Sequence, residues 1–208
     1  RIGGFGGAEG LARAIADERV DILVDATHPF AARISANAVE AARMAGVPLL
    51  VLNRPPWQAK AGDRWIAANN AAHAATLLGD APKTVFLAIG RQEIAPFKAA
   101  GHHRYVVRSV DPVAPDDLPE GAAVILARGP FAEADERALL LAHGVETVVS
   151  KNSGGDAAYG KIAAARALGL PVVMIERPPP PAAERVASVD DAFGRLRHLA
   201  ALVRKRGE

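Results

Sequence analysis

Residues 41–56 read AARMAGVPLLVLNRPP and combine the end of a predicted helix, a turn and a predicted strand. Gly46 follows the alanine-rich segment as a helix C-cap, and Pro48 just beyond it cannot continue the helix. The apolar run 49–52 is typical of a short strand with both faces buried. This order of elements predicts a helix-to-strand junction of an α/β protein.

The same pattern returns later in the chain. Residues 164–179 read AARALGLPVVMIERPP and align with residues 41–56 without a gap, with identical arginine, glycine, first proline and closing Arg-Pro-Pro. A generic helix-to-strand junction explains part of this likeness, but the Arg-Pro-Pro after both strands needs another explanation. We therefore predict two similar half-structures, residues 1–79 and residues 80–208.

Other apolar runs of strand length alternate with helical patterns along the chain. Further strands are predicted at 21–26, from 84, and at 105–109, 123–127, 147–150 and 172–175. Helices are predicted near 8–19, 29–45, 71–78, 93–100, 132–143 and 156–168, and a final one after Ser188, which forms a capping box with Asp191. Most of 57–66 and the segment RPPPPAAERV (177–186) are expected to be irregular. Apolar strands between helices predict the α/β class, with parallel sheets flanked by helices.

The composition excludes several kinds of protein. The chain of 208 residues has no cysteine, which removes disulfides, thiol nucleophiles and thiolate metal sites and suits the cytoplasm. No apolar run approaches the length of a membrane span. Basic residues are scattered, apart from the run 204–206 that we expect to end a solvated helix, and aromatic residues are few, so nucleic acid is not an expected partner. Because the sequence opens at Arg1 on what reads as a strand end, we expect a segment to precede it.

Five loops follow predicted strands and are where a ligand is expected. Ligands of open α/β sheets bind beyond the carboxyl ends of the strands. The loops are GGFGG (3–7), THPF (27–30), GRQE (90–93), ARGPF (127–131) and KNSGG (151–155). If the two half-structures face one another, these loops line one shared ligand cleft between them.

The first two loops each have a structural and a functional interpretation. GGFGG offers backbone N–H groups at the start of a helix, which suits a phosphate, although a plain strand-to-helix turn explains it equally well. It departs from the dinucleotide fingerprint, because Glu9 stands where the third glycine belongs. In THPF, Thr27 or His28 can cap the following helix and Pro29 suits its first turn. A lone histidine there is more often a cap or a surface group than a catalyst.

The other three loops carry cations that can hold an anionic ligand. Arg91 and Arg128 can each bind a carboxylate or a phosphate through paired hydrogen bonds, although Arg91 can equally pair with Glu93. In KNSGG, Lys151 can bind an anion or donate a proton, and a plain N-cap leaves Lys151 and Asn152 unexplained. No nucleophile elbow, carboxylate pair or zinc-binding histidine spacing is present. The residues alone therefore predict a two-domain α/β protein that binds an anionic ligand.

At these loops the chain resembles the precorrin-6A reductase family, enzymes of the corrin (tetrapyrrole) pathway to cobalamin. The matching stretches are GGFGG, DATHPFAARISANA, GRQE, ARGPF, KNSGG with its helix, and LGLPVVMIERP. The resemblance implies two Rossmann-like domains, NADPH as hydride donor, and reduction of one double bond of precorrin-6A to give precorrin-6B. The family's usual opening, a strand with a Gly-Gly-Thr-x-Glu loop that is expected to cradle the pyrophosphate, is absent from this sequence.

The resemblance also implies roles for individual residues. The implied cofactor-binding residues are Gly4, Phe5, Gly6, Gly7, Thr27, His28, Pro29 and Phe30. The implied substrate-binding residues are Arg91, Gln92, Arg128, Lys151, Asn152, Ser153, Gly154 and Gly155. Reduction also needs a proton, for which Lys151, His28 and Tyr159 are the candidate donors, with solvent as an alternative and no metal ion expected.

Two other functions stay open on the sequence. One is a two-domain tetrapyrrole enzyme that needs no cofactor, resembling uroporphyrinogen-III synthase. The other is a non-enzymatic protein that clamps an anionic small molecule between two domains. The sequence predicts no membrane partner and leaves the oligomeric state open, with a monomer among the options.

Overall fold

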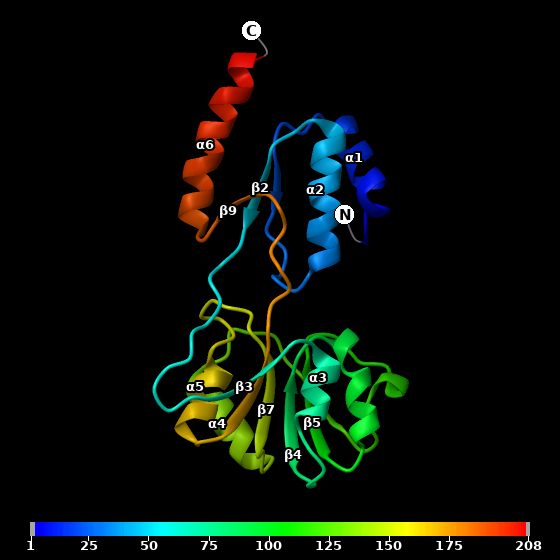
Figure 1. Ribbon diagram of the computed structural model, residues 1–208, viewed down its shortest axis with the longest axis vertical. Coiled ribbons are helices and arrows are strands. Elements are labelled where there is room, and N and C mark those ends of the chain that lie inside the picture. The colour runs from blue at the N-terminus through cyan, green and yellow to red at the C-terminus, as the bar shows by residue number, and fades with distance from the viewer. Residues whose placement is uncertain (1–2, 207–208) are drawn as a thin grey trace. The chain divides into compact units, whose positions relative to one another are not determined.

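The structure is a computed structural model that describes residues 3–206, with side chains described to residue 202 (Figure 1). The predicted strand end at residues 1–2 and the side chains of the basic run 204–206 lie outside this described part. The chain forms two compact units. Unit 1 comprises Arg1–Pro55 and Pro178–Glu208, and unit 2 comprises Pro56–Arg177.

Unit 1 is built on a three-stranded parallel sheet in the order β1-β2-β9. Its strands are β1 (Leu23–Asp25), β2 (Leu49–Leu52) and β9 (Glu184–Val186), and its helices are α1 (Gly7–Asp17), α2 (Ala32–Ala45) and α6 (Val189–Arg206). Helices α1 and α2 pack on each other through small side chains, with Ala12, Ile15 and Ala41 in a buried cluster. Helix α6 contacts β2 and β9, and Figure 1 shows α2 and α6 on opposite sides of the strands.

Ser188 caps α6 as predicted, but Asp191 completes the box through the Ser188 hydroxyl and not through the Ser188 backbone N–H. The backbone N–H of Asp191 donates to the Ser188 hydroxyl at 3.1 Å, and that hydroxyl donates to the Asp191 carboxylate at 2.6 Å. These two bonds satisfy one of the N–H groups that the first turn of a helix leaves without an internal partner.

Unit 2 is built on a six-stranded parallel sheet in the order β3-β8-β7-β4-β5-β6. Its strands are β3 (Arg64–Ala68), β4 (Thr84–Ala88), β5 (Arg104–Ser109), β6 (Ala123–Leu126), β7 (Thr147–Lys151) and β8 (Pro171–Ile175). Its helices are α3 (Ala71–Thr76), α4 (Glu133–Ala142) and α5 (Gly160–Ala167), with the 3-10 turns η1 (Arg91–Glu93), η2 (Ala95–Ala100) and η3 (Pro115–Asp117). The helix expected at residues 93–100 is thus a pair of 3-10 turns, of which the second contains Pro96.

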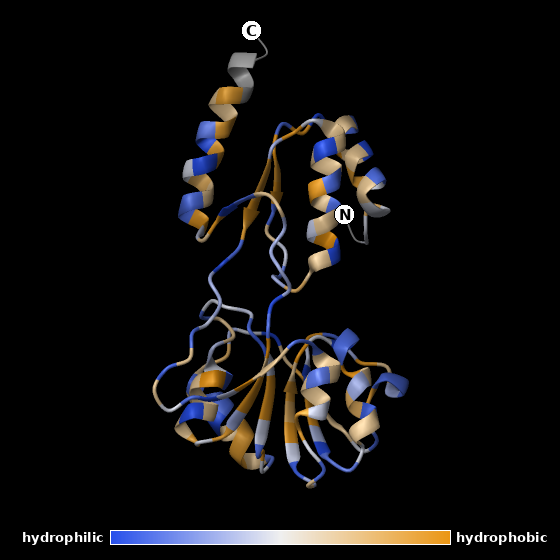
Figure 2. Cartoon of the chain, in the orientation of Figure 1, coloured by the Kyte–Doolittle hydropathy of each residue, from blue (hydrophilic) through white to orange (hydrophobic). Residues whose placement is uncertain are grey.

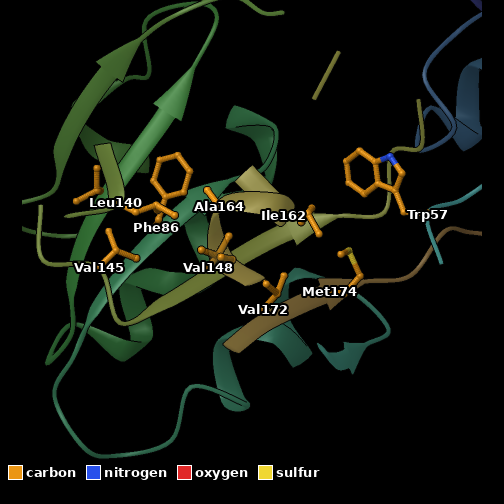
Figure 3. Close-up of a cluster of buried hydrophobic side chains, with 11 residues drawn as sticks. Trp57, Phe86, Leu140, Val145, Val148, Ile162, Ala164, Val172 and Met174 are labelled. Atoms are coloured by element: carbon orange, nitrogen blue, oxygen red, sulfur yellow. The ribbon is translucent and has the colours of Figure 1, made fainter. Parts of the chain in front are cut away.

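Both faces of the six-stranded sheet carry buried apolar side chains, and Figure 2 shows its strands as mostly hydrophobic. On one face, Phe86 and Val148 of the sheet pack with Leu140 of α4 and Ile162 of α5 (Figure 3). Side chains alternate along a strand, so Val85 points to the other face, which α3 and η2 cover. Sheets of this kind confirm the predicted α/β class with parallel strands flanked by helices. Within the described residues, no helix has both the length and the apolar character that crossing a membrane requires.

Strands β3 and β9 explain why Arg-Pro-Pro occurs twice. After β2 and the first Arg-Pro-Pro (54–56), the chain enters unit 2 and adds β3 alongside β8. After β8 and the second Arg-Pro-Pro (177–179), it returns to unit 1 and adds β9 alongside β2. Proline has no N–H to donate to a neighbouring strand, so each Arg-Pro-Pro ends a strand and starts a passage between units.

The boundaries between the units therefore differ from the boundary between residues 79 and 80 that the repeat predicts. Residues 56–79 belong to unit 2 because β3 pairs with β8, and residues 178–208 belong to unit 1 because β9 pairs with β2. The sequence predicts neither strand. Segments 57–66 and 177–186, expected to be irregular, contain the start of β3 and all of β9.

Candidate functional site

The order in which the chain adds strands to the six-stranded sheet reverses at one point. From β4 the chain proceeds through η1 and η2 to β5 on one side, and from β7 it proceeds through α5 to β8 on the other. Strands β4 and β7 are neighbours, so the loops after them diverge at their carboxyl ends. Open α/β sheets bind their ligands at such a switch point. The loops here are GRQE and KNSGG, which the structure therefore brings together.

An ion pair joins these two loops. The Lys151 Nζ lies 2.6 Å from Glu93 Oε1, and the Lys151 side chain is 13% exposed against 33% for Glu93. The ammonium extends over Gly90, since Nζ is 3.5 Å from where a Cβ on that glycine would stand. The alternative pairing of Arg91 with Glu93 does not form; Arg91 Nη1 instead lies 3.8 Å from Asp111 Oδ2, with both side chains exposed.

Asn152 fastens the KNSGG loop to the start of unit 2. Its Oδ1 accepts a hydrogen bond from the Trp57 N–H at 2.7 Å, and its Nδ2 donates to the Trp57 carbonyl at 3.0 Å. The Trp57 indole N–H donates to the Gly155 carbonyl at 2.8 Å, and Arg177 Nε donates to the Asn152 carbonyl at 2.6 Å. Trp57 follows the first Arg-Pro-Pro and Arg177 opens the second, so both passages between units are tied to this loop. The Asn152 side chain therefore has a structural role that the sequence did not reveal.

The rest of KNSGG forms a turn ahead of α5. The Ser153 N–H donates to the Lys151 carbonyl at 2.8 Å, and Gly154 and Gly155 adopt left-handed φ angles of 65° and 72°. The expected helix start near residue 156 is wrong, because α5 begins at Gly160 and Ser153 is not its N-cap. A Cβ on Gly160 would lie 2.4 Å from the Phe131 carbonyl oxygen, so the ARGPF loop packs directly on the helix start.

The C-terminal end of the ARGPF loop is held by contacts with the rest of unit 2, and its N-terminal part is exposed. The Phe131 N–H donates to the Ala157 carbonyl at 3.1 Å, and the Arg108 guanidinium stacks 3.7 Å from the Phe131 ring. Arg128 is exposed, as is Gln92 of the GRQE loop, and neither forms a hydrogen bond or an ion pair with any side chain or backbone group that the structure describes. Arg91 and Arg128 are exposed cations on two loops of the same sheet edge, and they can bind anionic groups from solution.

Tyr159, the third candidate proton donor, directs its hydroxyl away from the loops. The hydroxyl accepts a hydrogen bond from Arg166 Nη2 at 2.6 Å, and Arg166 lies in the last turn of α5. Because α5 runs antiparallel to the strands it connects, its last turn lies toward the opposite, amino edge of the sheet. Arg166 also pairs with Asp63 at 3.1 Å, just before β3 begins. These contacts favour a structural role for Tyr159.

Three buried charged residues lie under the same edge, and the sequence reasoning missed them. Arg108 pairs with Glu136, and Lys161, 4% exposed, donates to the Ala158 carbonyl at 2.7 Å. Burial lowers the pKa of Lys161 to about 7, and the nearby Arg108 charge acts in the same direction. Arg108 sits in an apolar strand and Lys161 in an alanine-rich helix, where the pattern indicates packing only.

In unit 1, the THPF loop is organised by Asp25, another residue that the sequence reasoning missed. The buried Asp25 Oδ1 accepts hydrogen bonds from the Thr27 N–H at 3.0 Å and the Thr27 hydroxyl at 2.7 Å. His28 is exposed; its Nδ1 accepts from the Phe30 N–H at 3.3 Å and its carbonyl from the Ala31 N–H at 2.7 Å. These bonds form a separate turn, so the predicted cap by Thr27 or His28 and the place of Pro29 in the first helical turn are wrong. Helix α2 begins at Ala32, without a side-chain cap.

The GGFGG loop folds back over the first turn of α1. Gly6 has a left-handed φ of 87°, and α1 begins at Gly7 without a side-chain cap. No atom lies within 4 Å of a Cβ built on Gly4, Gly6 or Gly7, so this backbone is open. A Cβ on Gly10 would lie only 1.8 Å from the Phe5 carbonyl oxygen, so position 10 requires a glycine. The dinucleotide fingerprint has its third glycine one position earlier, where this chain has Glu9.

Among the residues that the structure describes, no three histidine, aspartate or glutamate side chains come together as metal ligands. The loops offer cations, amide N–H groups and hydroxyls instead, which are the groups that bind carboxylates and phosphates.

Comparison with known proteins gives a family for this arrangement of loops. The family model described as precorrin-6x reductase CbiJ/CobK matches residues 1–197. The chain is 56% identical to a precorrin-6A reductase of Sinorhizobium sp. over 199 residues, which cover 95% of this chain and 76% of that protein. It is 48% identical to a precorrin-6A reductase of Rhodococcus erythropolis over 207 residues, covering 99% of this chain and 82% of that protein.

A solved structure agrees with these sequence matches. The structure of CobK precorrin-6A reductase superposes with a TM-score of 0.91 at 46% identity, covering 96% of this chain and 79% of the other. Its similarity extends over both units, and it confirms the family that GGFGG, DATHPFA and KNSGG predict. The chain belongs to the precorrin-6A reductase family.

Proposed function

We propose that this chain is an NADPH-dependent oxidoreductase of cobalamin biosynthesis that reduces a ring double bond of precorrin-6A to give precorrin-6B. The observation that carries the proposal is the position of Lys151 at the switch point of unit 2, in a chain of this family. Folds of this kind hold their ligands at the carboxyl edge of the parallel sheet, and the Lys151 ammonium lies at that edge.

The substrate side of the reaction suits the loops of unit 2. Precorrins carry several carboxylates on the rim of the ring, and a guanidinium can hold a carboxylate through two parallel hydrogen bonds. Arg91 and Arg128 have exposed side chains on the GRQE and ARGPF loops. Gln92 and Ser153 add polar groups, and Gly154 and Gly155 let a planar ring approach the backbone. Anchoring by several loops fixes which ring carbon faces the hydride donor.

The cofactor side suits the loops of unit 1. The open backbone of Gly4, Gly6 and Gly7 leads into the N-terminus of α1, whose N–H groups and dipole favour a phosphate. The THPF loop follows β1 in the same unit. It has exposed Thr27 and His28 and partly buried Pro29 and Phe30. When bound, NADPH supplies the hydride, and the protein orients the two reactants and excludes water. The shared cleft that the sequence predicts stays a prediction.

Reduction of a carbon–carbon double bond needs a proton at the carbon next to the one that accepts the hydride. Lys151 is the donor that its position favours, because its ammonium is at the switch point and mostly shielded from solvent. His28 is exposed on the THPF loop, and Tyr159 points toward Arg166. The Lys151 Nζ proton therefore passes to the ring carbon, and solvent restores it afterwards.

The test is NADPH oxidation by the purified protein with precorrin-6A, followed by absorbance and by the mass of the tetrapyrrole product. A gain of two hydrogens in the product, dependent on NADPH, supports the proposal. A protein that binds no NADPH and changes the ring without it would instead act like a cofactor-free tetrapyrrole enzyme. Tight precorrin binding with no hydride transfer under any condition would make it a ligand-binding protein.

A further inference from the structure

Glu93 is positioned to act on Lys151, although neither the motif pattern nor the proposed chemistry gives it a role. It lies in the last position of η1, on the loop after β4, while Lys151 ends β7. The two loops come from separate strands, and their contact exists because β4 and β7 are neighbours in the sheet. Their 2.6 Å ion pair is a direct link across the switch point.

We propose that Glu93 is the positioning residue for Lys151, holding its ammonium over Gly90 at the switch point. This inference rests on the proposed function, since it assigns Glu93 a part in the same reaction. A lysine side chain has four rotatable carbon–carbon bonds and reaches many positions when it is not restrained. The Glu93 carboxylate restrains its tip from one side and the Gly90 backbone from another.

Shielding from solvent makes this restraint effective. Exposed ion pairs contribute little because water competes for both partners. The Lys151 side chain is 13% exposed, so little water reaches the ammonium to take the place of the Glu93 carboxylate. Glu93 therefore keeps the Lys151 ammonium in place over Gly90 before the substrate arrives.

Several polar groups near Lys151 bond to the backbone of the KNSGG loop. The Ser150 hydroxyl and the Ser153 N–H both donate to the Lys151 carbonyl, at 3.1 and 2.8 Å. Arg177 donates to the next carbonyl, that of Asn152. On the neighbouring loops, Arg91 and Asp111 form an exposed pair of their own. The exposed ion pair between Glu40 and Arg43 in α2 provides the control, because it also joins a glutamate to a cation and neither residue is assigned to a ligand.

The first experiment is a double-mutant cycle on precorrin-6A reduction with full-length variants. If Glu93 acts through Lys151, we expect Glu93→Gln to lower kcat/KM by about tenfold or more and to have less than about twofold effect in a Lys151→Ala background. Glu93→Asp, with a shorter reach, should give an intermediate loss, and the control Glu40→Gln should change kcat/KM by less than about twofold. Losses that multiply in the double variant would overturn the proposal, since Glu93 would then act independently of Lys151.

The second experiment needs neither precorrin nor NADPH, so it separates this inference from the proposed function. The rate of Lys151 acetylation by acetic anhydride at a fixed pH is followed by peptide mass spectrometry. We expect the rate to rise about fivefold or more in Glu93→Gln, because loss of the ion pair lets the flexible lysine side chain move into solvent, where the reagent reaches its amine. An unchanged rate in both Glu93→Gln and Glu93→Asp would overturn the proposal. A raised rate in a protein that reduces no precorrin-6A would leave it standing and reject the proposed function.

Discussion

The Asn152 side chain exchanges two hydrogen bonds with the Trp57 backbone, at 2.7 and 3.0 Å, across 95 residues of sequence. This amide clasp holds the loop after β7 against the segment that has just entered unit 2. An amide can do this because it presents a donor and an acceptor side by side, which a hydroxyl or a carboxylate does not.

Loss of the clasp should lower stability. In Asn152→Ala, the Trp57 N–H and carbonyl lose their partners in a partly buried place, and we expect the free energy of unfolding to fall by about 1–3 kcal/mol. Urea unfolding measures this fall. Asn69→Ala is the control, because the Asn69 side chain is exposed, and it should change stability by less than about 0.5 kcal/mol. Equal effects of the two substitutions would contradict the role given to Asn152.

Alanine substitutions at two helical glycines should change the stability of the protein in opposite directions. A Cβ on Gly10 overlaps the Phe5 carbonyl oxygen, so Gly10→Ala must displace the GGFGG loop, and we expect a loss of about 1–3 kcal/mol and weaker NADPH binding. Gly194 in α6 has nothing within 4 Å of its Cβ position, so Gly194→Ala should gain about 0.5–1 kcal/mol from helix propensity. Thermal unfolding and a dinucleotide titration check both. A stabilised Gly10→Ala variant would show that the loop moves freely.

The buried Lys161 predicts a pH-dependent stability. Its pKa falls from 10.5 to about 7 on folding, so between these values the unfolded chain binds more protons than the folded one. Stability from this group therefore rises with pH from about 7 to 10.5 and is lowest below 7. Lys161→Met should stabilise the protein by about 1–4 kcal/mol at pH 7, and by less at pH 9.5. Urea unfolding at the two pH values tests this.

The exposed Lys98 provides the control for Lys161. Lys98→Met removes an exposed hydrogen bond to the Asp116 carbonyl and should change stability by the same amount, about 1 kcal/mol or less, at both pH values. If Lys161→Met gave a benefit that did not shrink with rising pH, the cause would be packing and not the titration of the amine.

Arg128 should matter for the substrate and not for the fold. Its side chain is exposed, so Arg128→Ala should leave the unfolding free energy within about 0.5 kcal/mol of the wild-type value. Loss of a carboxylate partner should raise the KM for precorrin-6A by about tenfold, with a smaller change in kcat. Arg104→Ala is the control, since Arg104 is exposed at the start of β5, on the opposite edge of the sheet. A similar rise in KM for both variants would show a general charge effect.

Much of the fold could be predicted because it depends on local patterns. The strand Leu49–Leu52, the strand from Thr84 and the caps at Gly46 and Ser188 are all as expected, since apolar runs and capping residues act over a few positions. The class of the fold and the four loops at the ends of β1, β4, β6 and β7 are visible in the same way. The motif order of those loops was also sufficient to indicate the family.

The contacts of the candidate site could not be predicted, because they depend on which strands are neighbours. Strands β3 and β9 each lie at a sheet edge and have mostly exposed or partly exposed side chains, so they lack the buried pattern that marks a strand. Backbone bonding to a strand far along the chain defines them, and that bonding sets the units. The sequence by itself determined the residues available at each loop. Only the tertiary structure, through the pairing of β4 with β7, decided that Glu93 would pair with Lys151 and not with Arg91.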